Sequence, residues 1–179
     1  MNIIPDLIKA FWILIPAYVA NATPPLAKGK RPIDFGKFFL GQRIFGDNKT
    51  IEGFVTGVIC GMITGFIESL LWSPINEYTL SSLGFSLPKM NLFTAFLIAF
   101  GAMFGDLVGS FIKRRFGIKP GASVPLLDQL NFVFGTILFI FPFIELNITM
   151  VIIMIVITPI FHKIANVFAY TLKIKKVPW

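Results

Sequence analysis

A chain of 179 residues in which 55% are hydrophobic and only 14% are charged holds more apolar side chain than one small soluble core can bury, so its composition predicts an integral membrane protein. The formal charge of +7 would suit a nucleic-acid partner in a soluble protein, but here the charges gather in short segments between apolar runs, so we expect no nucleic acid. The single cysteine, Cys60, excludes an intramolecular disulfide.

The first apolar run, residues 7–23, has the length of one membrane-spanning helix. Residues 20–22 (Ala-Asn-Ala) resemble the cleavage site of a secretory signal. A cleavable signal carries its positive charge ahead of the run, whereas this run has only Asp6 and Lys9 at its start and precedes several basic residues: Lys28, Lys30, Arg31, Lys37 and Arg43. The run is therefore predicted to be an anchor with its N-terminus outside.

The segment GQRIFGDNKTIEG, residues 41–53, resembles a phosphate-binding P-loop in its glycines, Lys49 and Thr50. Its spacing excludes a true P-loop, because two residues separate Gly46 from Lys49 and no strand is expected ahead of them. However, Asn48, Lys49 and Thr50 directly precede the second apolar run, and the N-terminus of a helix favours an anion. A phosphate contact is thus predicted, with a solvated loop lysine as the alternative.

The second and third apolar runs, residues 53–72 and 92–112, carry glycines at every fourth position: Gly53, Gly57, Gly61 and Gly65, then Gly101, Gly105 and Gly109. This spacing keeps each series on one helix face, where neighbouring backbones can approach closely. We expect these two helices to pack against each other and to bring their flanking loops together. Glu68, in the second run, is interpreted first as a packing residue.

Acidic and basic residues gather where the third run ends. Asp106 lies inside that run, where an unpaired carboxylate is costly. Lys113 and Arg114 follow on the same helix, Lys119 in the loop, and Asp128 at the start of the fourth run. Carboxylate oxygens suit Mg²⁺ and cations suit phosphate, so the cluster is typical of a magnesium nucleotide site. Simple pairing of Asp106 with Lys113 or Arg114 is the alternative.

The fourth and fifth apolar runs cover residues 130–145 and 148–172. With five spans, the segments 24–52 and 113–129 and the end from Lys163 lie on one face and hold fourteen of the sixteen Lys and Arg residues. By the positive-inside rule that face is cytoplasmic, which leaves the N-terminus, residues 73–91 and the turn at 145–147 outside.

Three prolines, Pro16, Pro142 and Pro159, predict kinks in the first, fourth and fifth spans. His162 and Asn166 share one side of the fifth span, and a role for them is left open against ordinary packing. The lysines at 173, 175 and 176 are expected to rest on anionic lipid headgroups.

Several of these segments resemble a known family. Residues 105–131, GDLVGSFIKRRFGIKPGASVPLLDQLN, resemble the signature of the CDP-diacylglycerol synthase superfamily, and NKTIEG, residues 48–53, is similar to its KKTWEG segment. Together with the size and the tail HKIANVFAYTLKIKKVPW, residues 162–179, they resemble the archaeal CDP-archaeol synthases. The resemblance implies a five-helix membrane fold, magnesium-dependent CTP binding, and an unsaturated archaeol phosphate with geranylgeranyl ethers as acceptor.

The chain departs from the diacylglycerol enzymes at two positions. Pro120 stands where their lysine is followed by aspartate, and their Asp-Arg-x-Asp reads Asp-Gln-Leu-Asn at residues 128–131. A neutral amide, Asn131, thus replaces their second aspartate. This favours a single Mg²⁺ over two and argues against a bacterial-type diacylglycerol enzyme.

The resemblance therefore implies a cytidylyltransferase that moves CMP from CTP to the lipid phosphate and releases pyrophosphate. The residues expected to be catalytic are Asp106, Asp128, Lys113 and Lys49, with Asp106 and Asp128 as the Mg²⁺ ligands. The residues expected to bind the nucleotide are Asn48, Lys49, Thr50, Lys113, Arg114, Lys119 and Asn131.

The expected fold is an all-α integral membrane protein of one domain, residues 1–179, with five transmembrane helices and cytoplasmic catalytic loops. The N-terminus is expected outside and the C-terminus in the cytoplasm. The partners are CTP, a prenyl-ether lipid phosphate and membrane lipids; a homodimer is left open. Two rival functions are a CTP-dependent prenol kinase, which would release CDP, and a non-enzymatic transporter or scaffold.

Overall fold

The computed structural model describes residues 3–171, without the side chains of residues 165–170. The lysines at 173, 175 and 176 and the side chain of Asn166 thus lie outside the described residues. Five α-helices dominate the chain, joined by a short 3₁₀ helix and a two-stranded hairpin: α1 Ile3–Ala22, η1 Pro24–Ala27, β1 Phe38–Phe39, β2 Gln42–Arg43, α2 Ile51–Leu83, α3 Leu92–Arg115, α4 Leu127–Ile140 and α5 Ile148–Thr171.

Three stretches are long and apolar enough to cross a membrane: Ile3–Ala27, Ile51–Leu83 and Leu92–Arg115. Two shorter apolar helices, Leu127–Ile140 and Ile148–Ile164, accompany them within the described part of the chain. The prediction of a helical membrane protein is thereby confirmed.

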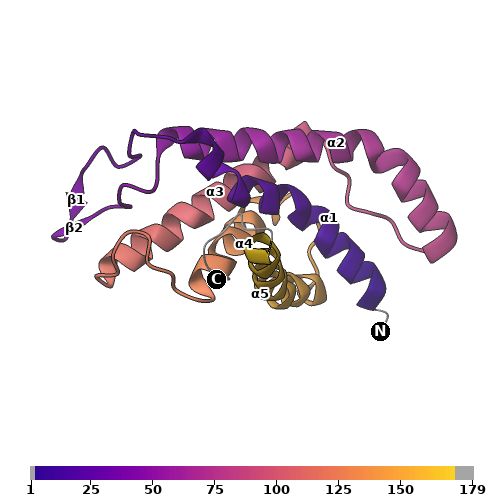
Figure 1. Ribbon diagram of the computed structural model, residues 1–179. Coiled ribbons are helices and arrows are strands. Elements are labelled where there is room, and N and C mark those ends of the chain that lie inside the picture. Colours follow the sequence, from indigo (N-terminus) through magenta and orange to yellow (C-terminus); the bar gives the residue numbers. More distant parts are fainter. Residues whose placement is uncertain (1–2, 172–179) are drawn as a thin grey trace.

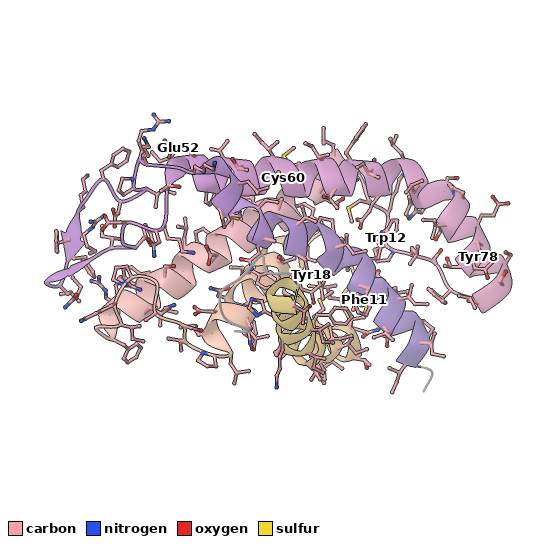
Figure 2. All side chains as sticks on the ribbon, viewed as in Figure 1. Phe11, Trp12, Tyr18, Glu52, Cys60 and Tyr78 are labelled. Atoms are coloured by element: carbon pink, nitrogen blue, oxygen red, sulfur yellow. The ribbon has the colours of Figure 1, made fainter. Side chains whose placement is uncertain are left out.

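Helix α1 is the centre of the bundle and contacts each of the other four helices (Figure 1). Its buried side includes Ala10, Ile13, Leu14 and Ala17, so small and large apolar side chains alternate where its neighbours approach. Figure 2 shows Tyr18 where α1 faces α5, and its hydroxyl lies 3.0 Å from that of Thr158. In hydrocarbon such polar contacts and close packing, rather than burial of apolar surface, hold helices together.

The glycines of α2 form its packing face, and all four of the predicted series are buried. A Cβ added at Gly61 would come within 2.7 Å of the Ala99 side chain on α3 and 2.9 Å of the Ala20 side chain on α1. Gly65 likewise faces Ala95 of α3. The predicted approach of α2 to α3 is confirmed for this series, and α1 packs into the same face.

The glycines of α3 face a different partner from the one expected. A Cβ at Gly101 would lie 2.7 Å from the carbonyl oxygen of Gly135 on α4, and one at Gly105 or Gly109 would overlap with Asn131 of α4. The sequence indicated the glycine face but not its neighbour, and the assignment of this series to α2 was wrong. Since α3 uses alanines toward α2, its glycines are free to bring α4 to backbone contact.

This α3–α4 contact leads to a prediction about stability. In Gly135→Ala the new methyl group would lie 2.7 Å from Gly105 Cα and closer still to the carbonyl of Gly101, so one helix must shift. We expect the free energy of unfolding to fall by about 3 kcal/mol, as for an overpacked core. Thermal unfolding in detergent measures it. The matched control is Gly84→Ala, where the methyl group meets open space and only the positive φ of 73° costs about 1 kcal/mol. Equal melting temperatures for Gly135→Ala and Gly84→Ala would contradict the prediction.

Helix α2 continues eleven residues beyond the expected end at Trp72, to Leu83. Pro74 lies inside it, and Figure 1 shows that the C-terminal part of α2 changes direction. A proline inside a helix removes one hydrogen bond and bends the axis without necessarily ending the helix. The segment after α2 then folds back: Trp12, labelled in Figure 2, donates from Nε1 to the Pro88 carbonyl at 3.1 Å.

Of the three prolines predicted to kink a span, two lie inside a helix and one does not. Pro16 and Pro159 lie inside α1 and α5, whereas α4 ends at Ile140, before Pro142.

Glu68 is buried in α2, and no hydrogen-bond partner among the described residues reaches its carboxylate oxygens.

The hairpin that follows η1 turns through Leu40 and Gly41, both at positive φ (49° and 74°), which is the backbone of a two-residue hairpin turn. Arg115, the last residue of α3, donates hydrogen bonds to the carbonyls of Phe39 and Arg43. The first loop is therefore tied to the end of α3, as Figure 1 shows at the side of the molecule away from the α2–α3 connection.

Candidate active site

A cavity of about 580 Å³ lies where the first loop and the α3–α4 loop meet the last turns of α3. Seven of the predicted site residues line it: Asn48, Lys49, Thr50, Asp106, Lys113, Arg114 and Asp128. Lys28, Asp47 and Ser110 line it as well. Side chains from the two loops are thus gathered at one end of the bundle.

Lys49 and Asp106 form an ion pair across this cavity, with Lys49 Nζ 2.5 Å from Asp106 Oδ2. The backbone around Lys49 is held in place because Ile33 N–H donates to the Lys49 carbonyl and Ile51 N–H to the Arg31 carbonyl. The two side chains are 28% and 17% exposed, so the pair is partly shielded from water and open to the cavity.

Lys113 binds the α3–α4 loop rather than Asp106. Its Nζ donates to both carboxylate oxygens of Asp128, at 2.9 and 3.0 Å, and to the Ala122 carbonyl at 2.5 Å. Asp128 also accepts from the Val124 N–H at 2.8 Å. These bonds hold Leu126 at φ 65°, a conformation that costs a bulky residue roughly 1–3 kcal/mol and persists only where its surroundings enforce it.

Arg114 lies beside this pair, buried to 4% exposure, and also lines the cavity. Its Nε and Nη1 have no hydrogen-bond partner among the described residues. A buried guanidinium with free donors is costly and is the usual partner of phosphate oxygens. Arg114 therefore gives the cavity a buried cation that is suited to bind an anion.

Thr50 and Asn48 complete the corner next to Lys49. Thr50 is the N-cap of α2, and its hydroxyl accepts from the Gly53 N–H at 3.1 Å. Asn48 is exposed and reaches across to Gly121 of the α3–α4 loop. The corner thus combines a helix N-terminus with a lysine and an amide.

Two of the predicted nucleotide-binding residues lie elsewhere. Lys119 is exposed in the α3–α4 loop and is not among the residues that line the cavity. Asn131 is buried between α4 and the glycines of α3, and its Oδ1 accepts from the Phe132 N–H. The alternative interpretation of Asp106, a pair with Lys113 or Arg114, differs from the observed pair with Lys49.

Comparisons with known proteins identify the family of the chain. A family model described as CarS-like CDP-archaeol synthase matches residues 1–179. The chain belongs to the CDP-archaeol synthase family. It is 42% identical over 180 residues to the CDP-archaeol synthase of Methanococcus aeolicus, with 100% of both chains covered. It is 41% identical over 174 residues to that of Pyrococcus furiosus, covering 97% of this chain and 98% of the relative.

A solved structure is also similar to this CDP-archaeol synthase family member. It is described as "Structural insight into an intramembrane enzyme for archaeal membrane lipids biosynthesis". The TM-score is 0.76 at 34% sequence identity, and the match covers 90% of this chain and 94% of the other. The chain is therefore an enzyme of the membrane, and the prediction of a membrane protein from its composition is confirmed.

This family member has a further charged cluster, around Asp34, that sequence reasoning missed. The Asp34 side chain is fully buried; Arg43 Nη2 donates to it at 2.6 Å, and the N–H groups of Gly36, Phe45 and Gly46 donate at 3.0 to 3.1 Å. Burial alone would raise the pKa of Asp34, but these donors hold that pKa well below its usual range. The cluster shapes the loop that ends in Lys49.

The Asp34 cluster predicts a pH-dependent stability. Because the pKa of Asp34 is depressed on folding, its contribution is complete above about pH 4 and is lost as the pH falls toward the folded value. Asp34→Asn should therefore lower the free energy of unfolding at pH 7 by about 3 kcal/mol, as for a broken buried pair, and so lower the melting temperature. The difference from wild type should shrink below about pH 4. Melting curves in detergent at several pH values test this, with Asp47→Asn, an exposed partner of the same Arg43, as the control. A difference in melting temperature between wild type and Asp34→Asn that stays constant with pH would contradict this prediction.

Among the residues that the structure describes, no group of three or more His, Cys, Asp and Glu side chains is arranged to hold a metal ion. Besides Asp47, which pairs with Arg43, the cavity offers two carboxylates, Asp106 and Asp128. In the described contacts Lys49 bonds only Oδ2 of Asp106, and Oδ1 accepts no hydrogen bond. Hard oxygen donors in this small number fit Mg²⁺, which binds proteins through one or two carboxylates and takes its other ligands from phosphates and water.

Proposed function

We propose that this cavity binds the triphosphate of CTP and that the enzyme transfers CMP to the phosphate of an unsaturated archaeol phosphate, 2,3-bis-O-geranylgeranylglycerol 1-phosphate. The observation that carries the proposal is Arg114, a buried cation with two free donor nitrogens that lines the same cavity as Lys49 and Lys113. Four cations, Lys28 among them, against three carboxylates, Asp47 among them, leave net positive charge for a polyanion. The relatives' name, CDP-archaeol synthase, gives the product, and CTP and archaeol phosphate are the substrates that this product implies.

Asp106 and Asp128 would hold the Mg²⁺, which, when bound, supplies Lewis-acid stabilisation of the phosphate charge. Each carboxylate is paired with a lysine, Lys49 or Lys113, in the described structure. Those lysines lie at the cavity wall, where their ammonium groups can turn to the β- and γ-phosphate oxygens. Asn48 and the α2 N-terminus beyond Thr50 add neutral donors to the same anion.

In the transfer itself the acceptor phosphate attacks the α-phosphorus of CTP in line. A bond forms from a lipid phosphate oxygen to that phosphorus, the bond to the bridging oxygen of the β-phosphate breaks, and pyrophosphate leaves with the electron pair. No nucleophile from the protein is required, because the acceptor is already an anion at neutral pH. Arg114 and the lysines would hold both polyanions and stabilise the developing charge, which is the main contribution in transfers of this kind.

All five helices cross the membrane in this proposal, and residues 1–179 form one domain. Helix α4, with 14 residues, covers only about 21 Å at ~1.5 Å per residue, and the turns at 141–144 extend it. The first loop and the α3–α4 loop, which share the cavity, would face the cytoplasm with the C-terminus, because basic residues concentrate there. Lys9 and Lys89, each beside an aromatic ring near the α2–α3 connection, would lie outside with the N-terminus.

Arg114→Gln tests whether Arg114 binds the triphosphate of CTP. The change removes the charge, but it breaks no hydrogen bond of Nε or Nη1, since those atoms make none among the described residues. We expect the Kd for CTP to rise about 100-fold, as for loss of one partner in a shielded charge pair. Equilibrium binding of labelled CTP to the purified protein with Mg²⁺ measures this. Lys37→Gln, which removes a charge from the exposed hairpin, serves as the control, and a Kd equal to that control would remove Arg114 from the site.

The reaction is tested by incubating the purified protein with CTP labelled in the cytosine ring, Mg²⁺ and either archaeol phosphate or phosphatidic acid. The proposal predicts label in the archaeol lipid and release of pyrophosphate. Release of CDP without labelled lipid would indicate a CTP-dependent kinase, and transfer to phosphatidic acid alone would overturn the acceptor.

A further inference from the structure

A second cavity, of about 210 Å³, opens on the outer surface of the bundle between α3 and α4. Its walls are apolar side chains: Phe104, Val108 and Ile112 of α3, and Leu127, Phe134 and Leu138 of α4. Phe104 is 38% exposed and Leu138 is 64% exposed, so the groove is open toward the lipid. Glycines form its floor, where the two helices touch.

One end of this groove lies close to the catalytic cavity. On α3, Ile112 lines the groove and the next residue, Lys113, lines the catalytic cavity. On α4, Leu127 lines the groove and Asp128 lines the catalytic cavity. On both helices, residues that line the two cavities are neighbours in sequence, so a chain attached to a phosphate near Asp128 is within reach of the groove.

The shape of the groove suits a hydrocarbon chain. From Leu127 to Leu138 it follows α4 for about 16 Å at ~1.5 Å per residue, away from the catalytic cavity and into the bundle's apolar half. Asn131 is the one residue with a polar side chain among the described residues that line it, and it lies one turn from Asp128. Polarity is thus confined to the end where a glycerol backbone would lie.

We propose, on the basis of the function proposed above, that the α3–α4 groove holds one hydrocarbon chain of the lipid acceptor and so orients its phosphate toward Asp128. Bulk lipid can fill any surface groove, but the lining of this one adjoins that of the catalytic cavity on both helices. The second chain of the acceptor stays in the surrounding membrane. The groove acts in substrate positioning and in selection for long chains.

Val108→Trp tests the proposal, because an indole at this half-exposed wall fills the middle of the groove. The assay compares two acceptors with the same glycerol phosphate headgroup, one with geranylgeranyl ethers and one with butyl ethers. We expect the KM for the long-chain acceptor to rise about tenfold or more, the size of effect that steric changes produce in apolar pockets. The KM for CTP and the kcat/KM for the short-chain acceptor should stay at their wild-type values.

The matched control is Val55→Trp, the same substitution at an exposed position of α2 that lines neither cavity. Leu138→Trp is a second test at the far end of the groove, on a side chain exposed enough to tolerate the change. Long-chain KM values equal to the control in both variants would overturn the groove as the chain site. A shift in oligomer size with unchanged KM would overturn it as well, in favour of a contact between copies. A wild-type protein that labels no lipid phosphate would instead reject the proposed function.

Discussion

In Asp128→Asn we expect CMP transfer to fall by about 10³-fold or more. Asp128 has two tasks in the cavity: its oxygens balance Lys113 at 2.9 and 3.0 Å, and its charge makes it a proposed ligand of Mg²⁺. An amide has the same shape but no charge, so Lys113 loses its counter-ion and the metal loses a ligand. Losing one electrostatic contact to a transition state typically costs 10²–10³ in rate, and here two are weakened together. Initial rates with labelled CTP, in detergent at saturating Mg²⁺, measure the change.

The control for this variant is Asp6→Asn, which also removes a carboxylate that bonds a neighbouring side chain, Asn147, but in a part of the chain that does not line the cavity. It should keep its activity. Because Asp128 also accepts from the Val124 N–H, the melting temperature of Asp128→Asn must be recorded alongside. A folded variant with activity within about threefold of wild type would exclude Asp128 from the mechanism.

The helices could be predicted from the sequence because hydropathy is a local property. The ends of the helices could not be predicted where a tertiary contact determines them. Helix α2 runs through Pro74 because the segment beyond it folds back, with Asn76 Oδ1 accepting from the Leu87 N–H at 2.7 Å. Nothing in the local sequence distinguishes that outcome from a loop.

The glycine series show the same limit at the level of packing. Four-residue spacing defines a face, and both predicted faces are buried. Which helix covers a face depends on the fit of the whole bundle. The α3 series meets Gly135, a single glycine in α4 that belongs to no repeat of its own.

The charged residues of the site could be named from the sequence, but their pairing could not. Lys49 and Asp106 are 57 positions apart, and Lys113 and Asp128 are 15 apart, so neither pair follows a helical spacing. Asp34 was missed for a similar reason, since its partners are mainly backbone N–H groups of a loop. Such contacts have no side-chain pattern in the sequence.

The pair of Lys49 and Asp106 leads to the second large effect. We expect Asp106→Asn and Lys49→Gln each to lower kcat/KM for CTP by about 10²–10³-fold, because one removes a proposed metal ligand and the other a proposed phosphate contact. Each variant should also lose about 2 kcal/mol of stability, since it leaves a partly shielded charge, 28% or 17% exposed in the wild type, without its partner.

The double variant separates structure from catalysis. With both charges removed, no unpaired ion remains, so the melting temperature should return most of the way to the wild-type value, as a double-mutant cycle for a contacting pair predicts. Activity should not return, because Asp106 is proposed to bind the metal and Lys49 the phosphates. In the proposal the two side chains pair with each other only while no metal nucleotide is bound. Recovery of CMP transfer together with stability would mean that the ion pair serves the fold alone, and the metal would then have to be held without Asp106.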